Sequence, residues 1–191
     1  MHGATILPLA TIAMTEVNDD RRMAAACAAG DASVFERVYR LYGDRMKSIA
    51  YNHLGNPADA EDAVQETFIK IHRAAGTYTG DASFSTWAFR ILINTCYDML
   101  RKRKRRPNEE PIDETPAATV RADATVDVAK RMMLKKMLDA LSEQRRTVFT
   151  LFEIDGLSHA EIGEVLGISE ANSKWILFST KKELQQQWKR A

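Results

Sequence analysis

The segment 156–184 carries the local signals that start and end two consecutive helices. Ser158 precedes Glu161 by three positions, which is the spacing of a capping box at a helix N-terminus. Apolar residues at helical spacing follow, and Gly167 can then take the left-handed conformation that commonly ends a helix. Ser169 is placed to cap a second, longer helix. The segment therefore predicts two helices joined by a tight turn.

The predicted pair of helices has the layout of a helix-turn-helix, whose second helix reads bases in the DNA major groove. The net charge of the chain is only +1, but its distribution is uneven. Residues 101–106 are all basic, whereas residues 107–127 contain six acidic residues against one arginine. Separate charge blocks are typical of separate surfaces for separate partners, and the near-neutral total disfavours indiscriminate coating of nucleic acid.

The rest of the sequence is also helical in pattern, and no segment has the alternation of a strand. Residues 22–106 contain three long amphipathic stretches, and helical periodicity returns in residues 128–191. Residues 107–127 combine prolines and acidic residues without any aromatic residue, a composition that buries little surface. We therefore predict an all-α fold with two small helical domains, 22–106 and 128–191, joined by a flexible acidic linker, 107–127.

Residues 1–21 are predicted to be a disordered leader, within which Met14 is an alternative start. The apolar run 4–14 is too short to cross a bilayer, so we expect no membrane insertion. Cys27 and Cys96 lack metal-ligand spacing, which favours reduced, buried thiols in a cytoplasmic protein over a redox role. The histidines form no metal or nucleophile pattern, so we expect no enzymatic activity, small-molecule substrate, metal or cofactor.

Three blocks of sequence follow one another in a distinctive order. Residues 58–73 read Ala-Asp-Ala-Glu-Asp-Ala-Val-Gln-Glu-Thr-Phe-Ile-Lys-Ile-His-Arg, and residues 80–100 contain Phe-x-x-Trp and Arg-Ile-x-x-Asn. Residues 141–149 read Leu-Ser-Glu-Gln-Arg-Arg-Thr-Val-Phe, ahead of the predicted helix-turn-helix. The blocks resemble the core-polymerase-binding helix, the promoter-melting helix and the C-terminal domain of the extracytoplasmic-function (ECF) sigma factors. The resemblance covers residues 28–106 and 130–186.

The first block places two carboxylates and an amide on one helical face. Asp62, Gln65 and Glu66 are spaced i, i+3 and i+4, and Val64 and Phe68 are predicted to pack behind them. A solvated helix face is the plainer interpretation of such a cluster. The resemblance instead implies that Asp62, Gln65, Glu66 and Phe68 bind core RNA polymerase, on a coiled coil of its largest subunits.

The second block supplies the residues expected to meet the −10 element of the promoter. Single strands are generally held by aromatic platforms and cationic tracks. The resemblance implies that Tyr78 lines a pocket for a flipped base, and that Arg90 and Asn94 contact phosphate and base edges. Trp87 lies in an apolar stripe, so core packing is the favoured interpretation. The basic run exceeds what helix capping needs, which favours phosphate contacts from Arg101, Lys102 and Arg103.

The resemblance implies that the N-terminal residues of the predicted recognition helix contact the −35 element, namely Ser169, Glu170, Asn172, Ser173 and Lys174. This helix departs from the family, because its expected DNA face carries Trp175, Ile176 and Phe178. Three explanations stay open, in order of preference. In the first, the helix is rotated about its axis so that Trp175 or Ile176 packs inward. In the second, the apolar face docks on an inhibitory partner. In the third, apolar side chains contact the methyl groups of thymine.

The sequence is therefore expected to encode an alternative sigma factor that directs RNA polymerase to promoters and assists DNA melting. Its expected partners are core RNA polymerase, promoter DNA and an anti-sigma protein, which in this family is often anchored in a membrane. A stand-alone helix-turn-helix regulator and a sigma-like decoy that occupies polymerase or anti-sigma are the two alternatives. A regulator would not need the acidic face or the melting helix.

Overall fold

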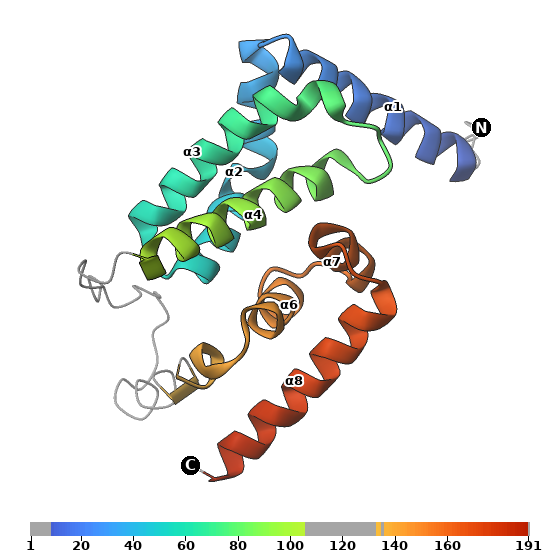
Figure 1. The fold of residues 1–191 in the computed structure, drawn as a ribbon. Helices are drawn as coiled ribbons and strands as arrows, with labels where there is room; N and C mark the ends of the chain where they lie inside the picture. Colours follow the sequence, from blue (N-terminus) through green and yellow to red (C-terminus); the bar gives the residue numbers. More distant parts are fainter. Residues whose placement is uncertain (1–8, 106–132, 135, 191) are drawn as a thin grey trace, which may run out of the picture.

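The computed structural model describes residues 9–105, 133–134 and 136–190, and no strand occurs among them. This part of the chain forms two helical units (Figure 1). The all-α fold with two helical domains is thus confirmed. The predicted linker, 107–127, lies outside the described residues.

The N-terminal unit consists of four α-helices and a short 3₁₀ helix, which Figure 1 shows in blue to green: α1 Leu9–Ala28, α2 Ala32–Leu54, α3 Pro57–Ala74, η1 Ala75–Thr77 and α4 Phe84–Arg105. Local signals explain where they begin. The Asp31 side chain accepts the backbone N–H of Ser33 at the start of α2. Asn56 accepts two backbone N–H groups at the start of α3, where Pro57 is the first helical residue.

Helix α1 already begins at Leu9, so the prediction of a disordered leader over residues 1–21 is wrong for residues 9–21, and residues 1–8 lie outside the described residues. Its C-terminal half packs on the rest of the unit, with Ala24 and Cys27 fully buried in the core. Apolar side chains from α2, α3 and α4 complete this core, among them Met46, Ile49, Val64, Ile71, Phe89 and Leu92. The apolar run of α1 is short and gives a weak helical signal in the sequence. The helix is stabilised instead by the packing of its C-terminal half on the core.

The C-terminal unit contains a helical stretch at residues 133–134 and 136–140, followed by α6 Glu143–Glu153, α7 His159–Leu166 and α8 Glu170–Arg190. Both halves of the predicted capping box form between Ser158 and Glu161 at the start of α7. Gly167 ends α7 in the left-handed conformation, with φ +67°. The predicted helix-turn-helix signals are therefore confirmed.

The two units pack against each other through α4 and α7 and through α2 and α6 (Figure 1). One continuous set of buried apolar residues runs through both units. Among the described residues, four side chains of the N-terminal unit form hydrogen bonds to the C-terminal unit, namely Arg45, Asn52, Arg90 and Tyr97. No described helix is both long and apolar enough to span a membrane.

The two cysteines lie inside the core of the N-terminal unit, and both are free thiols. Burial raises the pKa of Cys27 to about 11 and that of Cys96 to about 12. Both side chains therefore stay protonated near neutral pH, where a thiol is a poor nucleophile. The prediction of buried thiols is confirmed.

Candidate polymerase- and DNA-binding surfaces

The acidic face of α3 is exposed. The side chains of Asp62, Gln65 and Glu66 line a shallow groove of about 390 Å³ between α3 and α4. Phe68 lies on another side of α3, where its half-buried ring packs 5.6 Å from the ring of Tyr39 on α2. The structure thus brings together the three polar residues and places Phe68 as support for α3 against α2.

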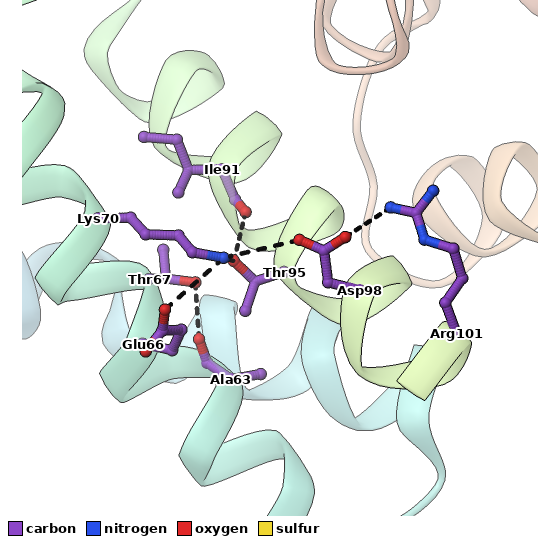
Figure 2. Close-up of polar contacts among 8 residues, drawn as sticks. All are labelled: Ala63, Glu66, Thr67, Lys70, Ile91, Thr95, Asp98 and Arg101. Atoms are coloured by element: carbon purple, nitrogen blue, oxygen red, sulfur yellow. Dashed lines mark hydrogen bonds and ion pairs between the residues drawn. The ribbon is translucent and has the colours of Figure 1, made fainter. Parts of the chain in front are cut away.

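Lys70 was not singled out from the sequence, yet it joins the acidic face to α4 (Figure 2). Its ammonium group donates a hydrogen bond to the Thr95 hydroxyl at 3.0 Å, and it lies 3.8 Å from the carboxylate of Glu66 and 3.9 Å from that of Asp98. The same Asp98 carboxylate accepts a hydrogen bond from Arg101 at 2.6 Å. The one available signal was the i, i+4 spacing from Glu66 to Lys70.

Thr67 and Thr95 fill the space between α3 and α4 without leaving unpaired hydroxyl groups. Thr67 donates to the carbonyl of Ala63 at 2.7 Å, and Thr95 donates to the carbonyl of Ile91 at 2.9 Å while accepting from Lys70 (Figure 2). Both residues are almost completely buried. Because every one of these polar groups is satisfied, the α3–α4 contact can behave as a rigid unit.

Tyr78 lies in the loop between η1 and α4, at the edge of an aromatic cluster. Its ring is 6.0 Å from that of Phe84 and 5.5 Å from that of Trp87, and its hydroxyl donates to the carbonyl of Ala82 at 2.6 Å. Burial, followed by the nearby charge of Asp20, raises the pKa of Tyr78 to about 12. Tyr78 is therefore a protonated, half-buried aromatic side chain, and Trp87 packs beside it as predicted.

Helix α4 presents Asn94 to solvent, whereas Arg90 already has a protein partner. The Arg90 guanidinium donates two hydrogen bonds to the backbone carbonyl of Glu164 in α7, one of them from Nε at 2.7 Å. In this arrangement Arg90 joins the two units. A contact between Arg90 and DNA requires this bond to break.

The basic run continues α4 as far as Arg105, with all five described side chains exposed. Arg103 donates to the carbonyl of Leu54 at 3.3 Å and lies 3.6 Å from the Asp59 carboxylate. Arg101 is paired with Asp98, while Lys102 lines the groove beside α3. Two of the three predicted phosphate contacts thus also stabilise the N-terminal unit.

The residues of the predicted −35 surface at the start of α8 are exposed, except Ser173. The Ser169 hydroxyl accepts the backbone N–H of Asn172 at 3.1 Å, as expected of a cap, and Asn172 itself is exposed. Glu170 and Lys174 are exposed and form an ion pair at 2.6 Å. These residues share the solvent-facing start of the helix.

Ser173 is fully buried, so its predicted contact with DNA is wrong. Its hydroxyl lies 2.9 Å from Nδ1 of His159, whose ring stacks on Phe152 at 4.4 Å between ring centres. Ser173 therefore holds α8 against α7 and α6. The signal for its burial was the helical spacing from Ser173 to the buried Ile176, Leu177 and Thr180, whereas its partner His159 lies in another helix.

The apolar residues of α8 divide between its two faces. Ile176 is buried, with 4% of its surface exposed, whereas Trp175 and Phe178 are 61% and 68% exposed. The preferred explanation, an inward-packing Trp175 or Ile176, is thus confirmed by Ile176, while Trp175 stays outside. Two neighbouring aromatic side chains remain on the outer surface of the recognition helix.

The sequence also matches known families and proteins. The Sigma-70 region 2 family matches residues 38–106, and the Sigma-70 region 4 family matches residues 131–184. The ECF RNA polymerase sigma factor SigM of Mycobacterium tuberculosis is 30% identical over 155 residues, which cover 81% of this chain and 77% of SigM. The chain belongs to the ECF sigma factors. We refer to its two units as region 2 and region 4.

A further relative agrees with this assignment, and two solved structures share the fold. The RNA polymerase sigma-H factor of Pseudomonas aeruginosa is 30% identical over 80% of this chain and 85% of its own length. The fold resembles CnrH in complex with the cytosolic domain of CnrY, with a TM-score of 0.66, 23% identity and coverage of 90% and 97% of the two chains. It also resembles RpoE of Bartonella quintana in complex with the anti-sigma factor NepR, with a TM-score of 0.63, 24% identity and coverage of 81% and 96%.

The predicted identity as an alternative sigma factor, a protein that directs RNA polymerase to promoters, is thereby confirmed. A sigma factor is a regulatory protein. The two family matches fall within the predicted domains 22–106 and 128–191. Membership in this family argues against the stand-alone regulator, because region 2 is present together with region 4.

Proposed function

We propose that this ECF sigma factor binds core RNA polymerase through the acidic face of α3 and opens the −10 element along α4. The observation that carries the proposal is the Lys70 network, which joins the exposed Glu66 to Thr95 and Asp98 of α4. A helix that docks on polymerase is thereby held in a fixed orientation to the helix that would melt DNA. A fixed orientation of α3 relative to α4 would place the DNA-melting residues accurately once α3 has docked on polymerase.

The polymerase-binding surface consists of Asp62, Gln65 and Glu66. Both carboxylates are exposed, so they suit a basic partner surface, which would steer association and fix register. Phe68 contributes indirectly, because it packs α3 against Tyr39 of α2. Lys102 at the other side of the groove limits how far a basic partner can extend toward α4.

The −10 surface consists of the Tyr78 loop, Asn94 and the basic end of α4. Tyr78 offers an aromatic face to a base that leaves the stack, and Asn94 offers an amide to a base edge. Lys102 and its basic neighbours supply the sequence-independent attraction to phosphates. Arg90 joins this surface when it leaves the carbonyl of Glu164.

The −35 surface consists of Ser169, Glu170, Asn172 and Lys174, together with the exposed Trp175 and Phe178. Ser173 is excluded because it is buried. Apolar side chains can contact the methyl group of thymine in the major groove. We therefore expect a −35 element in which thymines face the two aromatic residues.

An anti-sigma protein is proposed as the third partner, after core RNA polymerase and promoter DNA. RpoE of Bartonella quintana, which shares this fold, was determined in complex with the anti-sigma factor NepR. The exposed Trp175 and Phe178 are an apolar surface of the kind that interaction sites use. Polymerase supplies the catalysis, and the sigma factor acts in the cytoplasm, where polymerase and promoter lie.

Run-off transcription from a genomic promoter library, with purified chain and bacterial core polymerase, tests the proposal. Transcripts should appear with the wild-type chain, and Asp62→Ala/Glu66→Ala should abolish them together with core binding. Glu36→Ala/Asp44→Ala is the matched control, because it removes two exposed carboxylates from α2. Transcription that survives loss of the α3 carboxylates would contradict the assigned surface.

The unusual aromatic face of α8 also favours a second possibility, a sigma-like decoy that binds polymerase without starting transcription. The same experiment distinguishes the two, since a decoy binds core polymerase but gives no transcript from any promoter in the library.

A further inference from the structure

Two side chains of α1 reach the loop that carries Tyr78. The backbone N–H of Phe84 donates to the carboxylate of Asp20 at 2.8 Å, across 64 positions of sequence. The guanidinium of Arg21 donates to the backbone carbonyl of Thr79 at 2.8 Å, across 58 positions. Adjacent residues of one helix thus hold both ends of the loop between η1 and α4.

Asp20 acts at the end of the loop where α4 begins. Phe84 is the first residue of α4, so its N–H has no acceptor within the helix. The Asp20 carboxylate supplies that acceptor and places a negative charge at the positive end of the helix dipole. The Ser83 hydroxyl accepts the N–H of Thr86 at 3.2 Å, so α4 has a local cap as well as one from α1.

Arg21 acts at the opposite end of the loop, around Gly80. Gly80 has a φ of +81°, which L side chains rarely adopt. A Cβ atom at Gly80 would lie 2.7 Å from Nε of Arg21, so the guanidinium packs directly on the glycine. Together with the hydrogen bond to Thr79, this contact fixes the turn.

Tyr78 lies between these two contacts. Its hydroxyl is bonded to the carbonyl of Ala82 within the loop, and its ring packs on Phe84, the residue that Asp20 holds. The charge of Asp20 is also one of the causes that raise the pKa of Tyr78, after burial. The orientation of the Tyr78 ring therefore depends on α1 through two independent routes, the turn at Gly80 and the start of α4.

We propose that Asp20 and Arg21 are positioning residues that shape the Tyr78 loop for the single-stranded −10 element. The inference rests on the proposed function, from which it takes the contact between Tyr78 and a flipped base. In this account α1, which lies before the matched Sigma-70 region 2 at 38–106, contributes to promoter selectivity without touching DNA.

The Tyr78→Ala variant first identifies the −10 position at which the holoenzyme loses its base preference. Run-off transcription by the holoenzyme is then measured on four promoters that differ only in the base at this position. We expect Asp20→Ala and Arg21→Ala each to lower the ratio of best to worst base by about tenfold, the scale of one lost hydrogen bond to a charged group. Asp20→Asn should keep most of the selectivity, because its amide oxygen can still accept the N–H of Phe84. Should Asp20→Ala fail to fold by circular dichroism, Asp20→Asn and Arg21→Ala carry the test.

Asp19→Ala and Arg22→Ala are the matched controls. These neighbours form an exposed pair at 3.8 Å on the same helix, and they should leave the base ratio unchanged. An equal loss of transcription on all four promoters, or an unchanged ratio in Asp20→Ala and Arg21→Ala, would overturn the inference. If Tyr78→Ala changes no base preference at any −10 position, the proposed role of Tyr78 is wrong, and this inference falls with it.

Discussion

The contact between α3 and α4 and the contact between regions 2 and 4 both combine apolar packing with polar bonds, but they satisfy their polar groups to different degrees. Between α3 and α4, Lys70, Thr67 and Thr95 all have partners. Between the regions, Asn52 donates to the Asp155 carboxylate at 3.0 Å, yet the second oxygen of that carboxylate is buried without a partner. The buried Nε2 of His53, near Arg146 of α6, also lacks one.

This difference indicates that the α3–α4 contact is permanent and that the contact between regions 2 and 4 can open. An unsatisfied buried polar group costs free energy, and this cost is recovered when the group returns to water. Interfaces between domains are commonly polar and moderate in size, which makes relative motion the ordinary expectation. Region 2 thus behaves as one rigid body, and region 4 is held to it by bonds that DNA and polymerase can replace.

The largest effect is expected in the core of region 2. Leu92→Ala removes a fully buried side chain of α4, and we expect it to lower the free energy of unfolding by about 2–5 kcal/mol. Ile69→Ala on the exposed face of α3 is the control, which should change it by less than about 0.5 kcal/mol. Urea unfolding measures both. Similar values for the two variants would contradict a single packed body.

A smaller effect is expected at the contact between the regions. Asn52→Ala removes the only hydrogen bond to the Asp155 carboxylate among the described residues, and we expect it to weaken region closure by about 1–3 kcal/mol. Fluorescence energy transfer between labels on α2 and α8 measures the closed fraction. Core polymerase should bind this variant at least as tightly as the wild type, since α3 is untouched and opening of region 4 costs less free energy. Reduced binding to core would show that the two contacts are coupled.

The pH dependence of closure should separate the two unsatisfied groups. Burial raises the pKa of Asp155 to about 6, so the closed form binds a proton more tightly than the open form. Burial, and then the charge of Arg146, lowers the pKa of His53 to about 4, so there the open form takes up the proton. Acidification from pH 7 to pH 5 therefore favours closure through Asp155 and opposes it through His53.

Two variants make these opposite effects visible. In His53→Gln, acidification over this range should increase energy transfer between the regions, because Asp155 alone titrates. In Asp155→Asn, the same acidification should decrease it. The account is wrong if both variants respond in the same direction.

The smallest effect on stability is expected on the outer face of α8. Trp175→Ser/Phe178→Ser should change the free energy of unfolding by less than about 0.5 kcal/mol, because both side chains are exposed. Trp188→Ser, 45% exposed near the end of α8, is the control. Thermal unfolding measures stability, and the double variant alone should lose binding to −35 duplex. A loss of stability above about 1 kcal/mol would mean that the aromatic pair packs within the chain.

Features that depend on residues close together in the sequence could be predicted, whereas those that depend on distant residues could not. The helix-turn-helix was predictable because its signals, Ser158 with Glu161 and then Gly167, act over a few residues. The hydrogen bond between Ser173 and His159 was not predictable, because His159 belongs to another helix. The same holds for α1, whose Asp20 finds its partner 64 positions away.

The candidate site shows the same division. The exposed carboxylates of α3 follow from helical periodicity alone, as does the exposure of Asn94. The partner of Arg90 does not, since the carbonyl of Glu164 belongs to the other region. For Lys70 the sequence indicates only the i, i+4 spacing from Glu66. Its contacts with Thr95 and Asp98 arise because α4 packs against α3.

The opening of region 4 from region 2 is the most direct consequence of this account, because Arg90 cannot contact DNA while it binds the carbonyl of Glu164. Spin labels at Glu36→Cys on α2 and Gln185→Cys on α8 report the separation by pulsed electron spin resonance, since the buried native thiols resist labelling. A control pair, Asp44→Cys and Arg73→Cys, lies within region 2.

We expect a single distance between the α2 and α8 labels in the free chain and a longer one in the complex with core polymerase and promoter DNA, with the distance of the control pair unchanged. An α2–α8 distance that stays the same in the complex would contradict it.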